Sequence, residues 1–267
     1  MCTGLYTHLG VEMASCTMNK SPNRTKPKLS VTALRGEVWV VPDDGALKND
    51  PMLELDFFEP YLKRTFSRGD FIFRSGDEAD GFYLVLAGRV KLALPDPIRG
   101  ERVIAVCGEG DLFGAAACGG EQVHRAQAVS LQAGTLAVSL SCAELQEATK
   151  NTPSVALLLT RALAARVQVL EEEAEFANLP VQARLARTLL DLSKRLGHEI
   201  EPGVYDLELA LRQDEIASLA GATRVSATQA LSAWRSIGIV AGTRGSYQVD
   251  TARLEALMEL LEADAAR

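Results

Sequence analysis

The sequence predicts an α+β protein in which a domain of short β-strands is followed by a long helix and a smaller helical domain. Three observations predict this order. Short apolar segments separated by glycine turns fill residues 65–148, an apolar heptad spacing runs through residues 153–178, and two short helices precede a hairpin in residues 211–249. The 267 residues are 47% hydrophobic and 24% charged, a globular composition with enough chain for two domains.

Residues 1–50 are expected to form a weakly structured extension. The segment from Lys20 to Lys28 mixes prolines with basic residues and has no apolar period, although residues 38–41 have the composition of one strand. Residues 51–150 should form the β-domain. Its expected strands are Phe71–Phe73, Phe82–Ala87, Val90–Leu94, Val103–Val106 and Leu136–Leu140. Strands at this spacing with glycine turns are typical of a sandwich or barrel, and we expect a β-roll.

Residues 151–178 are expected to form one long helix, with Pro153 in its first turn. Apolar residues recur alternately every four and three positions, which is heptad spacing: Leu163, Val167, Leu170, Ala174 and Ala177. This face could pack on a second copy of the helix and make a homodimer. An ordinary helix in a monomer core fits so short a pattern equally well.

Residues 179–267 begin with a predicted helix from Pro180 to Leu196 and then contain a helix-turn-helix pattern. Gly221 can end the first helix with a positive φ, and Thr223 is a good N-cap for the second. Ala217 is small, as a close helix crossing requires. The second helix should bury Ala227, Ala230, Leu231 and Trp234. Its N-terminal half, the part that meets base edges in a major groove, should expose Arg224, Val225, Ser226, Thr228 and Gln229.

A hairpin is predicted after this pair of helices. Residues 237–240 and 242–249 are apolar segments around a Gly-Thr-Arg-Gly turn, with Arg244 at the tip. Residues 211–249 contain four arginines against two acidic residues, Asp214 and Glu215. The pattern therefore favours a winged helix-turn-helix that binds DNA over a helical hairpin used only for packing.

Charge and motif searches exclude several classes of protein. The net charge of −7 argues against a surface coated with basic residues, but not against a local patch. The sequence has no apolar run of about 18 residues and no signal-peptide pattern, so we expect a cytoplasmic protein with no membrane contact. The five cysteines have no zinc spacing, and no catalytic or P-loop motif occurs. We therefore expect no enzyme and no metal site.

These segments together resemble the cyclic-AMP receptor protein/FNR family of bacterial transcription factors over residues 53–260. The resemblance rests on the order and spacing of the segments 68–73, 76–77, 82–90, 110–114 and 211–249. It implies an N-terminal jelly roll like a cyclic-nucleotide-binding domain, a dimerisation helix and a C-terminal winged helix. It also implies a homodimeric regulator, for example an activator, that binds palindromic promoter DNA and RNA polymerase. The alternative is a nucleotide-binding regulatory module that does not act through DNA.

The effector implied by the family is less well matched. Gly114 opens the stretch where cyclic-AMP sensors bind phosphate, and Arg125-Ala126 closes it eleven residues later. Ala115 stands where those sensors carry a ribose-binding glutamate, and losing such a hydrogen bond costs roughly 1.5–3 kcal/mol. Val169 and Leu170 stand where hydroxyl residues hold adenine. Cyclic AMP is therefore disfavoured, and two alternatives stay open: constitutive activity set by the abundance of the protein, or an apolar ligand in an altered pocket.

The cysteines and histidines do not match the other inputs that the family resemblance implies. Cys2 and Cys16 are too few ligands for an iron–sulfur cluster. His124 lies near the predicted phosphate site, but a lone histidine is more often an ordinary polar residue than a haem ligand. Cys107 and Cys118 have no basic neighbour close in sequence that would activate a thiol.

Specific DNA contacts follow from the family's docking geometry as hypotheses. Arg224 should contact guanine, Val225 a thymine methyl group, and Gln229 a base edge or a phosphate. Thr223 and Thr228 lie in the same surface. Phosphate contacts are assigned to Arg212, Gln213, Ser226 and Arg244.

Overall fold

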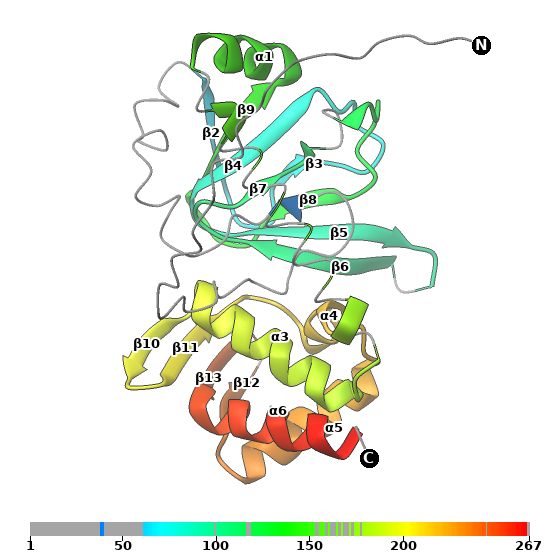
Figure 1. The fold of residues 1–267 in the computed structure, drawn as a ribbon, viewed down its shortest axis with the longest axis vertical. Helices are drawn as coiled ribbons and strands as arrows, with labels where there is room; N and C mark the ends of the chain where they lie inside the picture. The colour runs from blue at the N-terminus through cyan, green and yellow to red at the C-terminus, as the bar shows by residue number, and fades with distance from the viewer. Residues whose placement is uncertain are drawn as a thin grey trace, which may run out of the picture.

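The computed structural model describes residues 38–39, 61–98, 100–115, 119–152, 155–157, 160, 164, 167, 171, 174–176, 178–243 and 245–265. In Figure 1 the strands of the first domain occupy the upper part of the molecule, and the helices and small sheet of the second domain lie below them. Within the described residues, no helix is long and apolar enough to cross a membrane.

The first domain is a β-roll of two antiparallel sheets, with strand orders β1-β7-β4-β9-β2 and β3-β8-β5-β6. Residues of both sheets form one buried apolar cluster, which includes Phe66, Val85, Leu92 and Phe113. The strands are β1 (Val38–Trp39), β2 (Leu62–Phe66), β3 (Phe71–Phe73), β4 (Gly81–Ala87), β5 (Val90–Asp96), β6 (Gly100–Cys107), β7 (Leu112–Phe113), β8 (Gln127–Ser130) and β9 (Thr135–Ser141). The predicted β-roll is confirmed.

The tight turn between β4 and β5 requires glycine for two reasons. Gly88 has a φ of +91°, which residues with a side chain rarely adopt. A Cβ atom at this position would also lie 2.7 Å from the Thr135 hydroxyl oxygen. The turn therefore brings β9 close to the β4–β5 hairpin and helps to close the roll.

A short helix that the sequence analysis did not predict follows the β-roll. Helix α1 (Cys142–Asn151) begins at Ser141, whose hydroxyl accepts from the Glu144 amide, while the Glu144 carboxylate accepts from the Ser141 amide. Its sequence is polar and buries only Ala148, so it carries no apolar period. In the segment predicted as one long helix, every described residue from 155 to 176 is helical.

The second domain surrounds a small sheet of order β10-β11-β13-β12. The predicted first helix, two motif helices and hairpin are present. The strands β10 and β11 and the last helix were not predicted. The elements are α3 (Val181–Leu196), β10 (His198–Glu201), β11 (Val204–Glu208), α4 (Gln213–Leu219), α5 (Arg224–Ser236), β12 (Val240–Thr243), β13 (Ser246–Asp250) and α6 (Thr251–Ala265).

The two domains share one continuous apolar core. Ala93, Val103 and Val106 of the β-roll belong to the same buried cluster as Leu196 of α3 and Ile216 of α4. In Figure 1, α3 and α4 lie directly under β5 and β6. Contacts between α4 and β6 place the helix-turn-helix against the β-roll.

Buried ion pairs add polar contacts at this junction. Lys91 Nζ of β5 lies 2.6 Å from Glu101 Oε1 of β6 and 2.7 Å from Glu215 Oε1 of α4. Arg195 of α3 pairs with Asp111 of the β-roll and with Asp191 of its own helix. The position of the helix-turn-helix relative to the β-roll is thus fixed by both apolar and ionic contacts.

Candidate DNA-binding surface

The turn of the helix-turn-helix forms as its sequence predicts. Helix α4 packs Ile216, Ala217 and Leu219 into the core, with each at most 5% exposed. Gly221 then adopts a φ of +59°, and the Ala222 amide donates to the Ala217 carbonyl at 2.8 Å. This is the helix end that a glycine permits, and it turns the chain sharply toward α5.

Helix α5 is capped and anchored at its start. The Thr223 hydroxyl oxygen accepts from the Ser226 amide at 3.1 Å, so Thr223 is the predicted N-cap. Ala227, Ala230, Leu231 and Trp234 are all buried. The inner face of the helix is therefore fixed, and the orientation of its outer face follows from it.

The outer face of α5 presents polar and apolar groups together. Arg224, Val225, Thr228 and Gln229 are exposed and Ser226 is half-buried; the Val225 side chain is 66% exposed. The Thr228 hydroxyl donates to the Arg224 carbonyl at 2.8 Å, and its oxygen also lies 3.2 Å from Gln213 Oε1. Thr228 and Thr223 thus hold the surface in place through their hydroxyls, while Arg224, Val225 and Gln229 project from it.

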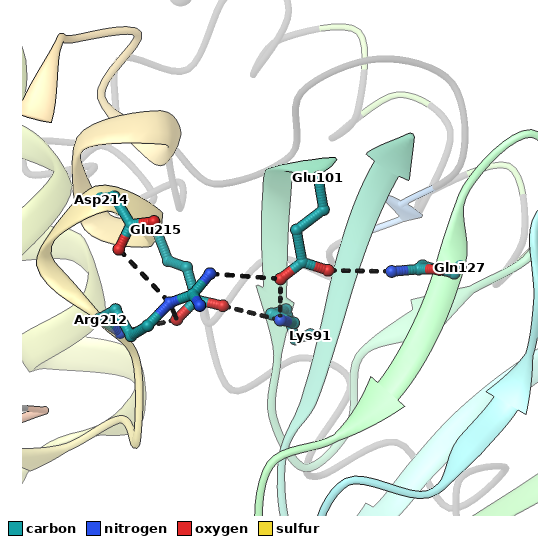
Figure 2. A network of polar contacts seen from close by, with 6 residues as sticks. All are labelled: Lys91, Glu101, Gln127, Arg212, Asp214 and Glu215. Atoms are coloured by element: carbon teal, nitrogen blue, oxygen red, sulfur yellow. Dashed lines mark hydrogen bonds and ion pairs between the residues drawn. The ribbon is translucent and has the colours of Figure 1, made fainter. Parts of the chain in front are cut away.

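The start of α4 adds Arg212 and Gln213 to the same surface. The Arg212 guanidinium is 66% exposed and lies 3.4 Å from Asp214 Oδ1, 3.7 Å from Glu215 Oε2 and 3.8 Å from Glu101 Oε1. Figure 2 shows it at the edge of a network that continues through Lys91 and Glu101 to Gln127. Arg212 therefore belongs to the domain junction as well as to the predicted surface.

The charges in this network support one another. Burial alone would lower the pKa of Lys91, but the hydrogen bonds that its ammonium donates to Glu101 and Glu215, together with their negative charges, outweigh burial and raise that pKa. Burial would raise the pKa of Glu101, but the Lys91 ammonium outweighs it and lowers that pKa. Both groups are therefore held in their charged forms, as the ion pairs require.

The wing is the β12–β13 hairpin. Val240 pairs with Val249 and Thr243 with Ser246, and the Arg235 guanidinium of α5 donates to the Gly242 carbonyl at 2.9 Å. This bond ties the wing to the second helix. Arg244, predicted at the tip of the wing, lies outside the described residues.

A cleft opens where the two domains meet beside this surface. Its volume is about 940 Å³, and it is lined by Arg68, Ala210, Leu211, Arg212, Gln213, Asp214 and Arg224. Arg68 comes from the turn between β2 and β3 and was missed by the sequence analysis. The residues around it, Ser67 to Asp70, form an ordinary glycine turn with no signal for a site.

Four of the six predicted effector positions are described, and they belong to the β-roll. Gly114 has a φ of +78°, and a Cβ atom there would lie 2.9 Å from the Tyr83 ring. Ala115 is half-buried, Arg125 is exposed and Ala126 is fully buried. The Arg125 carbonyl accepts from the Ser75 hydroxyl at 2.9 Å. Val169 and Leu170 lie outside the described residues.

His124 and Cys107 are core residues. His124 is 1% exposed and stacks on Phe73 with ring centroids 3.7 Å apart. Burial lowers its pKa, against the opposing charges of Asp80 and Asp77, and neither ring nitrogen has a hydrogen-bond partner among the described residues. Cys107 is completely buried, and burial raises the pKa of its thiol well above the usual value. Cys118 lies outside the described residues.

Two of the five predicted dimer residues are described. Val167 is 52% exposed and Ala174 is exposed. Leu163, Leu170 and Ala177 lie outside the described residues. The two visible members of the heptad row are thus uncovered in a single chain.

Comparisons with known proteins agree with this architecture. The family model of the cyclic nucleotide-binding domain matches residues 63–151, and that of the Crp-like helix-turn-helix domain matches residues 183–260. A global nitrogen regulator from Nostoc sp. is 30% identical over 196 residues, which are 72% of this chain and 86% of the relative.

Two further relatives extend the comparison. A CRP-like cAMP-activated global transcriptional regulator from Mycobacterium tuberculosis is 29% identical over 167 residues, 62% of this chain and 74% of the relative. A solved CRP/FNR family regulator from Thermus thermophilus is 25% identical with a TM-score of 0.58, and the match covers 74% of this chain and 98% of that one. At nearly equal identity, one of these relatives is named as cAMP-activated and another as a nitrogen regulator.

Proposed function

Because the chain belongs to the Crp/Fnr family of DNA-binding transcription regulators, we propose that it acts in the cytoplasm as a homodimer on palindromic promoter sites. It recruits or contacts RNA polymerase there. The winged helix-turn-helix supports this function over a nucleotide-binding module that does not act through DNA.

The outer face of α5 carries the proposal. Arg224, Val225 and Gln229 project from a helix whose opposite face is fixed in the core, as a recognition helix requires. We assign Arg224 to guanine, Val225 to a thymine methyl group and Gln229 to a base edge or a phosphate. Phosphate contacts are assigned to Ser226, Arg212, Gln213 and Arg244.

A second copy of the chain would cover the long helix. Val167 and Ala174 are exposed apolar residues at heptad spacing, and packing them against the same residues of a partner would remove them from water. The other members of this row are Leu163, Leu170 and Ala177. The two recognition helices of such a dimer should enter major grooves about 34 Å apart.

The effector site departs from that of a cyclic-AMP sensor. Ala115 supplies no carboxylate for a ribose hydroxyl, and Val169 and Leu170 supply no hydroxyl for adenine. Gly114, Arg125 and Ala126 match the two ends of the family's phosphate-binding stretch. We therefore propose that cyclic AMP is not the effector at physiological concentration.

One selection experiment tests these assignments together. The full-length protein is used to select duplexes from a random DNA pool, with and without cyclic AMP. We expect enrichment of a palindrome, no effect of the nucleotide, and an Arg224→Ala variant that loses guanine preference at one position of each half-site. Lys150→Ala, which removes an exposed charge from α1, is the matched control. A pool with no enriched palindrome would contradict the proposed function.

A further inference from the structure

The cleft at the domain junction combines arginines from both domains. Arg68 belongs to the β-roll, Arg212 precedes α4, and Arg224 is the first residue of α5. Asp214 is the single acidic residue among those that line it. The cleft therefore has an excess of positive charge, although the whole chain has a net charge of −7.

Two of these guanidinium groups have no partner in the described part of the chain. No hydrogen bond or ion pair of the described residues engages the side chain of Arg68 or Arg224, whereas Arg212 lies between Asp214, Glu215 and Glu101. Unpaired guanidinium groups that face one cleft suit phosphate oxygens, which they bind in a forked geometry.

The position of Arg68 beside the recognition helix is fixed by the docked domains. Lys91 joins β5 to Glu215 of α4 at 2.7 Å, and Arg195 joins α3 to Asp111. The shared apolar core holds the same two domains together. A duplex that brings its major groove to Arg224 therefore also approaches the turn that carries Arg68.

The phosphate backbone of such a duplex borders the groove that receives α5. The major groove is about 12 Å wide, and B-DNA carries one negative charge per about 1.7 Å of its axis. A strand of phosphates must consequently pass close to the leading end of α5, where Arg224 and Arg68 share the cleft.

We propose that Arg68 extends the DNA-binding surface onto the β-roll and contacts a backbone phosphate at the edge of the half-site. This inference rests on the proposed function. The β-roll then contributes to DNA affinity directly, in addition to any effector that it binds. Because the contact is to phosphate, it adds affinity without sequence preference.

The test compares Arg68→Ala, Arg68→Lys and Lys150→Ala in the full-length protein, on the palindrome selected above. Lys150 lies at the end of α1, at the opposite end of the β-roll from α4 and α5 (Figure 1). Loss of one charge-assisted contact in each half-site of a dimer predicts that Arg68→Ala binds at least about a hundredfold more weakly at low salt. Arg68→Lys should retain part of the affinity, and Lys150→Ala should match the wild type.

Salt dependence identifies the contact as a phosphate contact. Each lost phosphate contact makes the slope of log affinity against log salt less negative by about 0.9. Arg68→Ala should therefore change the slope by about 1.8 for a dimer and leave the ratio of palindrome to mutated-site affinity unchanged. On duplexes shortened to remove the flanking phosphates, the difference between Arg68→Ala and wild type should disappear.

The outcomes separate this inference from the proposed function. If the wild type selects a palindrome but Arg68→Ala behaves like Lys150→Ala, the inference is wrong and the proposed function stands. If the wild type shows no palindrome preference, both are wrong. Titration of inorganic pyrophosphate into the wild type and into Arg68→Ala tests whether the cleft binds a small phosphorylated ligand instead. Binding of pyrophosphate that requires Arg68, with unchanged DNA affinity of the variant, would assign the cleft to a small phosphorylated ligand and overturn the inference.

Discussion

Lys91 is the central group of the polar network that joins the two domains, and its removal should destabilise the whole molecule. Its side chain is 10% exposed and faces Glu215, which is 8% exposed, and Glu101, which is 22% exposed. The variant Lys91→Met keeps the length and the apolar part of the side chain. It leaves two largely buried carboxylates with the exposed Arg212 guanidinium, 3.7 Å from Glu215 and 3.8 Å from Glu101, as their remaining counter-charge.

Breaking a buried pair by removing one partner costs about 3–5 kcal/mol, because the remaining charge is buried and unpaired. Glu101 is more exposed and accepts a hydrogen bond from Gln127 at 2.9 Å, so most of the cost should come from Glu215. We therefore expect Lys91→Met to lose about 3 kcal/mol, a large share of a typical stability of roughly 5–15 kcal/mol. The double variant Lys91→Met/Glu215→Gln should recover about half of the loss, because no uncompensated charge then remains on α4.

Equilibrium urea unfolding at pH 7 measures these costs, with circular dichroism for the whole chain and fluorescence for the buried Trp234. Lys91 lowers the pKa of Glu101, and Lys91→Met removes this effect. The deficit of the variant relative to the wild type should therefore be smaller at pH 5 than at pH 7. Stability of Lys91→Met within about 1 kcal/mol of the wild type, or strictly additive single and double variants, would refute the reasoning.

Three further predictions concern the pH response, the recognition helix and a strained residue. Burial lowers the pKa of His124, so the stability that neutral His124 contributes is complete above pH 6.5 and is lost as the pH falls below that value. His124→Phe should therefore reduce the difference between the unfolding free energies measured in urea at pH 7 and pH 5. An unchanged difference would show that His124 does not cause the pH dependence. Thr223→Ala removes the N-cap of α5 and should lower the free energy of unfolding, measured by heat or urea, by about 0.5–2 kcal/mol. Thr223→Ser keeps the hydroxyl and should cost little. Equal costs for the two variants would show that the hydroxyl does not stabilise the helix. Ala210 has a φ of +55°, so Ala210→Gly should stabilise by up to about 1 kcal/mol and Ala210→Val should destabilise; the opposite order in urea unfolding would show that the backbone is unstrained there.

The elements that the sequence predicted are those that bury a clear set of apolar side chains. Strand β4 and helix α5 each bury one apolar set, and their patterns were correctly interpreted. Strand β10 exposes all four of its residues and β7 has only two residues, so neither carries a period. These strands exist because tertiary pairing supplies their backbone partners, which local sequence does not encode.

The candidate surface divides in the same way between local and tertiary determinants. The outward face of α5 could be predicted because the inward face of the same helix fixes it. The charge near that face could not be counted from residues 211–249 alone. Arg212, counted there as a free positive charge, lies among Asp214, Glu215 and Glu101, and the cleft gains Arg68 from a distant turn. The potential that a phosphate meets depends on which side chains the fold brings together, so a charge count over residues 211–249 leaves out both Arg68 and Glu101.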